Sequence, residues 1–207
     1  MKVFRGLPNA QSRRPCALTI GNFDGVHQGH RALLSRVTEA ARRLNIASSV
    51  MTFEPHPREY FAHLTGDEGR APRRVANLRD KLQALDSAGI ERVIVEHFNA
   101  RFAAMSPADF VQQLLIDGLQ VKWLIVGDDF RFGAKRAGDF AMLAEAGKQH
   151  GFDVESLPTI THDDARISSS AVRSALHAGD FAHVRELLGH AYFISGRVQH
   201  GRKLGRT

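Results

Sequence analysis

The 207-residue sequence lacks several features that mark whole classes of protein. It has one cysteine, so no disulfide can form within the chain. Because Cys16 stands where an apolar run begins, we interpret it as a buried thiol without a functional role. No apolar run approaches the roughly 20 residues of a membrane-spanning helix, and residues 1–10 have no signal-like apolar core. We therefore expect no membrane partner and a cytoplasmic location.

Several catalytic signatures are also missing. The chain contains no Gly-x-x-x-x-Gly-Lys-Ser/Thr, which excludes a P-loop enzyme. It has no Ser-His-Asp or Cys-His arrangement that would indicate an activated nucleophile. A zinc site at His27 and His30 is an alternative that needs a third ligand; none follows at metal-ligand spacing, although other histidines could converge on it. Internal repeats and low-complexity segments are absent.

Charge and composition favour a globular protein with an anionic ligand. Apolar residues make up 43% and charged residues 24% of the chain, as in ordinary soluble domains. Lysine and arginine number 28 against 22 acidic residues, which gives a formal charge of +6. Phosphorylated metabolites and nucleic acid both fit this excess.

Strand and helix patterns alternate along the chain. Apolar runs predict strands at 16–23, 47–53, 93–95, 121–126 and 154–157. Helical spacing predicts helices from about 30 to 44, 78 to 88, 107 to 115, 139 to 149, 169 to 178 and 181 to 188. Segment 64–74, rich in glycine, proline and charge, is expected to be the most flexible. The alternation predicts an α/β fold whose parallel sheet is covered on both faces.

A glycine-rich turn follows the first predicted strand. Gly21, Gly25 and Gly29 recur at every fourth position, and glycine lets the backbone approach a phosphate closely. His27 and His30 stand three residues apart at the start of the next helix, where the amide dipoles also favour an anion. This pattern predicts a phosphate site.

Three further segments follow predicted strands or begin a helix. Residues 168–170 are serines with Arg173 one turn on, and their hydroxyls, amides and guanidinium can hold a pyrophosphate. The alternative is a capping run beside a solvated arginine. Residues 53–57 contain two prolines and indicate a rigid loop, and Asp128 and Asp129 either meet a nucleotide or cap a turn.

Four blocks of this sequence together resemble bacterial FAD synthetases of the His-x-Gly-His (HxGH) nucleotidylyltransferases. They are Thr19-Ile-Gly-Asn-Phe-Asp-Gly-Val-His-Gln-Gly-His30, Phe53-Glu-Pro-His-Pro-Arg58, Val126-Gly-Asp-Asp-Phe-Arg-Phe-Gly133 and Ile167-Ser-Ser-Ser-Ala-Val-Arg173. The family usually has threonine where Ser170 stands, and serine keeps the hydroxyl. The resemblance implies a Rossmann-like doubly wound sheet and transfer of AMP from ATP to FMN.

The resemblance also implies roles for individual residues. His27, His30 and Arg173 would be catalytic, with Mg²⁺ bound mainly through ATP and no metal ligand assigned to the chain. The ATP site would comprise Gly21, Phe23, Asp24, Gly29, Asp128, Asp129, Ser168, Ser169 and Ser170. The FMN site would comprise Phe53, Pro55, His56 and Pro57.

The domain organisation follows from the same resemblance. Residues 1–188 would form the adenylyltransferase domain, and 189–207 the beginning of a riboflavin kinase β-barrel module, so that a full-length parent would be bifunctional. A closing hairpin of the first domain is the alternative for 189–207.

Two other functions compete with this interpretation. One is another HxGH adenylyltransferase, acting on pantetheine phosphate or nicotinamide mononucleotide, against which the Phe-Glu-Pro-His-Pro block speaks. The other is a basic nucleic-acid-binding module related to class I tRNA synthetases. The arginines are scattered and not interleaved with aromatic residues, so we expect no nucleic-acid partner.

Overall fold

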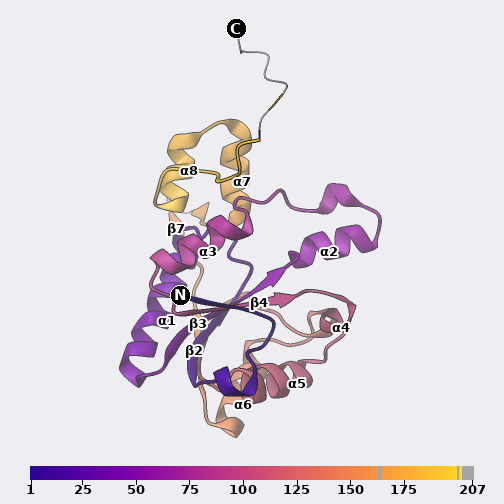
Figure 1. Cartoon of the computed structure of the whole chain (residues 1–207), viewed down its shortest axis with the longest axis vertical. Helices are drawn as coiled ribbons and strands as arrows, with labels where there is room; N and C mark the ends of the chain where they lie inside the picture. Colours follow the sequence, from indigo (N-terminus) through magenta and orange to yellow (C-terminus); the bar gives the residue numbers. More distant parts are fainter. Residues whose placement is uncertain (163–164, 200, 202–207) are drawn as a thin grey trace.

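The computed structural model describes residues 1–162, 165–199 and 201. Its centre is a six-stranded parallel sheet in the order β1-β4-β3-β2-β5-β6 (Figure 1). The strands are β1 (Lys2–Arg5), β2 (Cys16–Ile20), β3 (Ala47–Glu54), β4 (Arg92–His97), β5 (Val121–Gly127) and β6 (Asp153–Leu157). A small antiparallel pair, β7 (Thr161–His162) with β8 (Ala165–Arg166), follows β6. The predicted α/β class with a parallel sheet is thus confirmed.

Helices cover both faces of the sheet. The α-helices are α1 (Gln28–Leu44), α2 (Pro57–Leu64), α3 (Leu78–Ser87), α4 (Ala100–Ala103), α5 (Pro107–Asp109), α6 (Phe140–His150), α7 (Ser169–Ala178) and α8 (Phe181–Leu188). A π-helical stretch, η3 (Phe110–Gly118), continues α5, and short 3-10 turns are η1 (Ala10–Ser12), η2 (Glu68–Arg70) and η4 (Ala134–Arg136). In Figure 1, α7 and α8 stand apart from the sheet, above α3.

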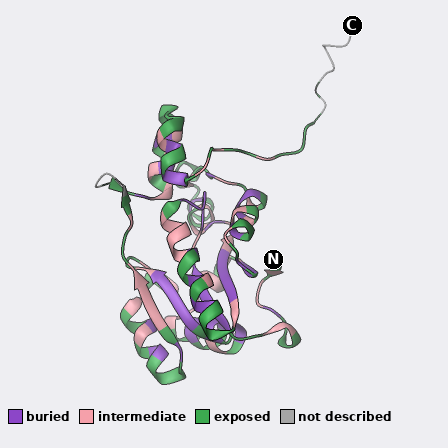
Figure 2. Cartoon of the chain, turned by 90° about the vertical axis from the view of Figure 1, so that its left-hand side faces the viewer, coloured by how far each residue is buried: buried purple, intermediate pink, exposed green. Residues whose placement is uncertain are grey.

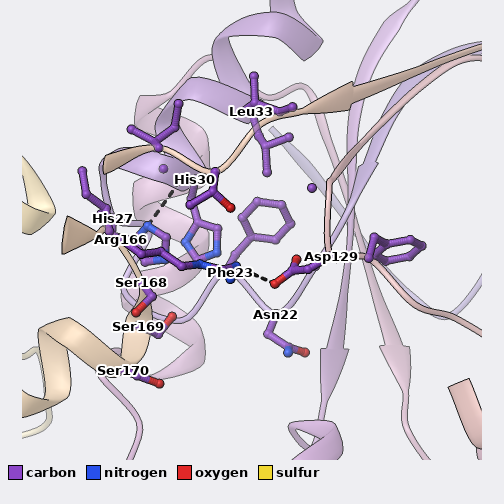
Figure 3. Close-up of a pocket in the computed structure, with 18 of the residues that line it drawn as sticks. Asn22, Phe23, His27, His30, Leu33, Asp129, Arg166, Ser168, Ser169 and Ser170 are labelled. Carbon is purple, nitrogen blue, oxygen red and sulfur yellow. Dashed lines mark hydrogen bonds and ion pairs between the residues drawn. The ribbon is translucent and has the colours of Figure 1, made fainter. Parts of the chain in front are cut away.

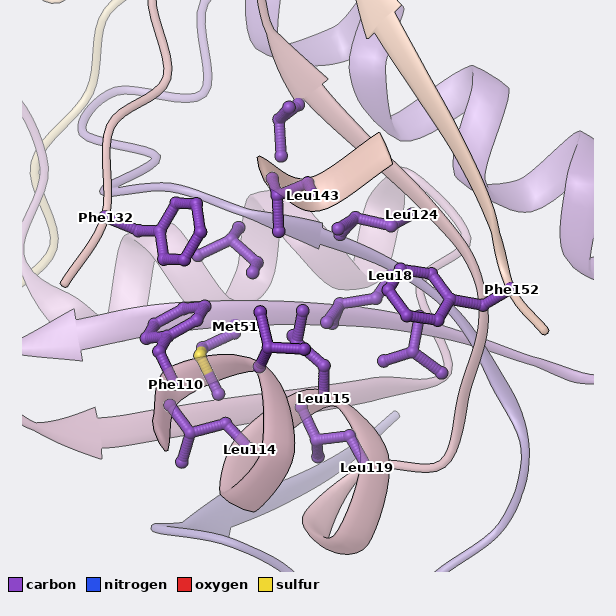
Figure 4. Close-up of a cluster of buried hydrophobic side chains, with 14 of the residues drawn as sticks. Leu18, Met51, Phe110, Leu114, Leu115, Leu119, Leu124, Phe132, Leu143 and Phe152 are labelled. Carbon is purple, nitrogen blue, oxygen red and sulfur yellow. The ribbon is translucent and has the colours of Figure 1, made fainter. Parts of the chain in front are cut away.

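Each face of the sheet has its own hydrophobic core. On one face Leu34 and Val37 of α1 and Leu85 of α3 pack against Val50 and Ile125. On the other face η3 and α6 pack on the sheet, as Leu115, Leu143, Leu18 and Leu124 show in Figure 4. Figure 2 shows the result, with buried strands between helices whose outer sides are exposed. Burial on both faces explains why the inner strands β2, β4 and β5 are largely apolar runs rather than alternating ones.

The five predicted strands and six predicted helices are all present, the helix at 107–115 being mostly π-helical. Strands β1, β7 and β8, helices α2 and α4 and the 3-10 turns were not predicted, and two of these bear on the argument. Strand β1 pairs with β4 at the edge of the sheet and is mostly exposed, so it has no apolar run. Residues 53–57 were interpreted as a rigid loop, but Pro57 begins helix α2. Proline suits the first turn of a helix, because the amide hydrogen that it lacks would have no partner there. His56 and Glu59 form a capping box.

The order of the strands determines where a ligand can bind. From β2 the chain first adds β3 and β4 on one side, and later places β5 and β6 on the other. The carboxyl ends of β2 and β5 therefore lie side by side at the switch point of the sheet, where open α/β sheets bind ligands. The glycine-rich turn follows β2, and Asp128 and Asp129 follow β5.

The segment after α8 lies against α3. Residues 190–199 have neither helix nor strand. The backbone amide and hydroxyl of Ser195 both donate to the buried carboxylate of Asp80, and Asn77 donates to the carbonyl of Ser195. Residues 200 and 202–207 of the predicted kinase-module fragment lie outside the described residues. Within the described part of the chain, no helix combines the length and apolar character that crossing a bilayer requires.

Candidate active site

Buried side chains that pack inside the glycine-rich turn set its shape. Phe23, Gly25 and Val26 have φ angles of 48°, 82° and 42° in the left-handed region, and the Phe23 and Val26 side chains are buried. A Cβ atom on Gly25 would stand 2.6 Å from Cγ1 of Val75, so a larger residue does not fit there. The turn is therefore fixed before any ligand binds.

His27 caps the helix that the turn leads into. The amide of His30 donates to Nδ1 of His27 at 3.3 Å, which is one of the dashed contacts in Figure 3. Because Nδ1 accepts, the hydrogen of the neutral ring must be on Nε2. The two imidazole rings stack with centroids 3.7 Å apart. His27 can thus cap α1 with one nitrogen and donate to a ligand with the other.

Both histidines are neutral near pH 7. Burial is the main cause that lowers the pKa of His27 to about 4, with the nearby guanidiniums of Arg166 and Arg173 adding to it. Burial and the adjacent His27 hold the pKa of His30 well below its ordinary value. The neutral rings of His27 and His30 can therefore donate hydrogen bonds while adding no positive charge to the ligand-free site.

Arg173 is held by a network behind the cavity wall. Its Nη2 donates to Oδ2 of Asp24 at 3.0 Å, and its Nε donates to the carbonyl of Arg73 at 2.8 Å. The other Asp24 oxygen accepts from the amides of Val75 and Ala76 at 2.9 and 3.1 Å. Asp24, predicted to bind ATP, is buried and is not among the residues lining the cavities. Its carboxylate orients Arg173 instead.

The three serines lie in a row at the start of α7 (Figure 3). Ser168 is the N-cap and accepts from the amide of Ala171. Ser169 donates to the carbonyl of Asp24, which ties α7 to the glycine-rich turn. The Ser170 hydroxyl lies 3.5 Å from a guanidinium nitrogen of Arg173.

The two aspartates after β5 have different partners. Asp128 accepts from the amide and hydroxyl of Thr159 at 3.0 and 3.1 Å. Asp129 pairs with Arg166 at 2.5 Å, across the opening that Figure 3 shows. The sequence analysis did not predict Arg166 as a site residue. Its position two residues before the serine run is the feature that could have indicated it.

These groups line one polar cavity of about 350 Å³. All predicted catalytic and ATP-site residues except Asp24 lie in its wall. The lining residues are Ile20, Gly21, Asn22, Phe23, His27, Gly29, His30, Leu33, His56, Arg58, Gly127, Asp128, Asp129, Phe130, Leu157, Pro158, Thr159, Ile160, Arg166, Ile167, Ser168, Ser169, Ser170 and Arg173.

A second cavity, of about 730 Å³, is lined by phenylalanines. These are Phe53, Phe61, Phe98, Phe102, Phe110, Phe130 and Phe132. Of the predicted FMN-site residues, Phe53, His56 and Pro57 lie in this wall, whereas Pro55 borders a separate hollow beside Tyr60. Phe130 and Phe132 belong to the block 126–133 that resembles the family, although no flavin contact was predicted for them. Phe61, Phe98, Phe102 and Phe110 come from other segments, and no sequence motif indicated them.

The polar and aromatic cavities meet along a common edge. Gly21, Asn22, His56, Arg58, Asp129 and Phe130 line both. At this edge His56 accepts the Arg58 amide on Nδ1 at 3.0 Å, which leaves Nε2–H as its donor. Burial lowers the pKa of His56 to about 4, so this ring is also neutral near pH 7. A polar ligand in one cavity and an aromatic ligand in the other would touch here.

One carboxylate lies where it could contact a cation. The described residues contain no group of three or more His, Cys, Asp or Glu side chains that could hold a metal ion. Asp129, at the common edge, is a carboxylate that could add one oxygen to a cation brought in by a ligand.

Comparison with known proteins gives consistent matches. The FAD synthetase family model matches residues 9–171. The bifunctional riboflavin kinase/FMN adenylyltransferase of Escherichia coli K12 is 49% identical over the whole chain, and the one of Pseudomonas fluorescens is 47% identical. The chain spans 65% of the length of each of these relatives.

Solved structures share the fold. A Streptococcus pneumoniae structure described as a macrolide-efflux protein has a TM-score of 0.74 at 23% identity, over 92% of this chain and 61% of that one. Pantoate-beta-alanine ligase from Francisella tularensis has a TM-score of 0.51 at 13% identity, over 88% of this chain and 79% of that one.

Proposed function

Because the chain belongs to the FAD synthetase family, we propose that it transfers AMP from ATP to FMN, giving FAD and pyrophosphate. The observation that carries this proposal is the pair of cavities that share an edge. The polar cavity contains His27, His30 and Arg173, which suit a triphosphate. The aromatic cavity suits a flavin ring system, because stacked and edge-on phenylalanines bind flat apolar surfaces.

The reaction needs no protein nucleophile. A phosphate oxygen of FMN attacks the α-phosphorus of ATP, an O–P bond forms, and the bond to the β-phosphate oxygen breaks as pyrophosphate leaves. The chain's contribution is to hold the two phosphates in line and to stabilise the charge on the oxygens. The common edge of the cavities is where the attacking oxygen would lie.

Each residue of the polar cavity then has a defined task. His27 donates from Nε2 to an oxygen of the α-phosphate, and His30 completes this wall. Arg173, held by Asp24, and the hydroxyls of Ser168–Ser170 bind the departing pyrophosphate. The N-terminus of α1 adds its amide dipoles.

We propose that Mg²⁺ accompanies ATP. This hard cation takes oxygen ligands and keeps several waters, so triphosphate oxygens and water fill most of its shell. When bound, it neutralises phosphate charge. Of the chain's own groups, Asp129 and Asp128 are the candidates to contact it, and Asp129 is better placed because it also borders the aromatic cavity.

The remaining parts of the proposal concern the cell and the longer protein. We propose ATP and FMN, rather than nucleic acid, as the partners, and the cytoplasm as the location, as suits a metabolic enzyme. In a longer protein that contains this chain, riboflavin kinase activity would reside beyond residue 188, with 189–207 as the start of that module.

The test is incubation of the protein with FMN, ATP and Mg²⁺, followed by chromatography for FAD and an assay for pyrophosphate. Reactions with pantetheine phosphate or nicotinamide mononucleotide as acceptor test the other adenylyltransferase chemistries. FAD and pyrophosphate in equal amounts are expected. Product only with another acceptor, or a salt-dependent gel shift with nucleic acid and no FAD, would refute the proposal.

A further inference from the structure

Arg74 joins two carboxylates at the two ends of segment 54–59, whose middle residues border the aromatic cavity. Its Nη1 and Nη2 donate to the Glu54 oxygens at 2.9 and 2.5 Å. Its Nε and Nη2 donate to the Glu59 oxygens at 2.6 and 2.5 Å. Glu54 ends β3 and Glu59 lies in the first turn of α2, so one guanidinium closes the segment between them. About a third of the Arg74 side chain is exposed.

The closed segment borders both cavities. Glu59 also accepts from the amide of His56 at 3.1 Å, which completes the capping box at the start of α2. His56 and Arg58 lie at the common edge of the cavities, and Pro57 lies in the aromatic wall. The position of Glu59 therefore sets the positions of the side chains that would meet FMN.

The backbone on either side of Arg74 is held by hydrogen bonds to Arg173 and Asp24. The carbonyl of Arg73 accepts from Arg173, and the amides of Val75 and Ala76 donate to Asp24. Four consecutive residues, 73–76, thus connect the pyrophosphate-side arginine with the flavin-side segment.

The charges explain why an arginine is needed. Hydrogen bonding to Arg74 is the main cause that holds the pKa of Glu59 below its usual range. Without the guanidinium, the carboxylates of Glu54 and Glu59 would face each other without the cation that joins them. Their repulsion would open segment 54–59. A lysine could neutralise charge but cannot donate from a planar fork to both carboxylates.

We propose that Arg74 is a positioning residue for adenylyl transfer, which sets segment 54–59 of the FMN site at a fixed place relative to Arg173. This rests on the proposed function. We expect the effect to fall mainly on FMN, because His27, His30 and Arg173, which would bind ATP, lie outside segment 54–59, whereas only His56 and Arg58 of that segment also line the polar cavity.

The experiment compares Arg74→Gln and Arg74→Lys with a matched control, Arg79→Gln, which removes an exposed arginine from α3. For Arg74→Gln we expect the KM for FMN to rise about tenfold, as the loss of a charge-assisted contact implies, with the KM for ATP within about twofold of wild type. Arg74→Lys should recover part of this loss, and Arg79→Gln should match wild type. Adding Glu59→Gln to Arg74→Gln should cost less than the two single changes combined.

Hydrogen exchange of the ligand-free protein gives a readout that does not depend on activity. The amides of His56, Arg58 and Glu59 should exchange faster in Arg74→Gln than in wild type, whereas those of α1 should not change. Unchanged exchange there overturns the positioning role even if the wild-type protein forms no FAD, which is the separate failure of the proposed function. If FAD forms and Arg74→Gln changes both KM values equally, or neither, the proposal is also wrong.

Discussion

His27 allows the capping and the catalytic tasks of one imidazole to be separated. Asparagine places its side-chain oxygen near the position of Nδ1, so His27→Asn keeps an acceptor for the His30 amide but has no donor at Nε2. Glutamine places its amide nitrogen near Nε2, so His27→Gln keeps a donor but is a poor cap. His27→Ala loses both. Comparing the three variants therefore separates the cost of losing the cap from the cost of losing the donor.

The structure gives the sizes of the two effects. The cap is one hydrogen bond, 3.3 Å long, at the start of a 17-residue helix, and removing such a cap costs about 1 kcal/mol of stability. A lost donor to transition-state charge costs about 10²- to 10³-fold in turnover, or roughly 2.7–4 kcal/mol. We therefore expect His27→Asn to be slow but stable, His27→Gln to be less stable but faster than His27→Asn, and His27→Ala to show both losses.

Steady-state turnover at saturating FMN and ATP measures the first effect, and urea unfolding measures the second. Flavin fluorescence titration serves as the control, because FMN affinity should change little in all three variants. Wild-type turnover in His27→Asn would refute the donor role of Nε2. Stability losses in His27→Asn as large as those in His27→Ala would refute the capping role of Nδ1.

Four further predictions test other parts of the site. Arg173→Lys should be much less active when ATP is varied, because an ammonium cannot bond both the carboxylate of Asp24 and the carbonyl of Arg73 and still face the cavity. Restored activity would make Arg173 a point charge only. Pro57→Gly should weaken FMN binding, measured by flavin fluorescence, and leave ATP binding nearly unchanged, whereas equal losses would indicate an unfolded site. The free energy of unfolding should fall as the pH is lowered from 6.5 toward 4, because the histidines of the unfolded chain bind protons that the buried rings do not. The loss should reach up to about 1.4 kcal/mol per pH unit for each of His27, His30 and His56. A urea midpoint that stays constant across this window would contradict the prediction. With riboflavin and ATP, residues 1–207 should make no FMN, and any such product would contradict the proposal that 189–207 are the start of a riboflavin kinase module.

The sequence by itself determined the fold class and most of the polar site. Apolar runs and helical spacing are local patterns, and because parallel strands end at one edge of the sheet, motifs that follow β2 and β5 had to meet. His27 and His30, which follow β2, were predicted in this way, whereas the serines before Arg173 were predicted from their place at a helix start and from the family resemblance. Elements without an apolar pattern were missed, as the exposed β1 shows.

Only the tertiary structure decided which side chains act on each other across loops. Asp24 and Arg173 are 149 residues apart, and their pairing moved Asp24 from the predicted ATP contacts to the support of Arg173. Arg74 ends the segment 64–74, whose composition indicated only flexibility, and yet it binds two carboxylates from β3 and α2. The aromatic cavity has the same origin, because its rings come from separate elements. Such contacts depend on how the helices pack on the sheet, and this geometry cannot be predicted from local sequence patterns.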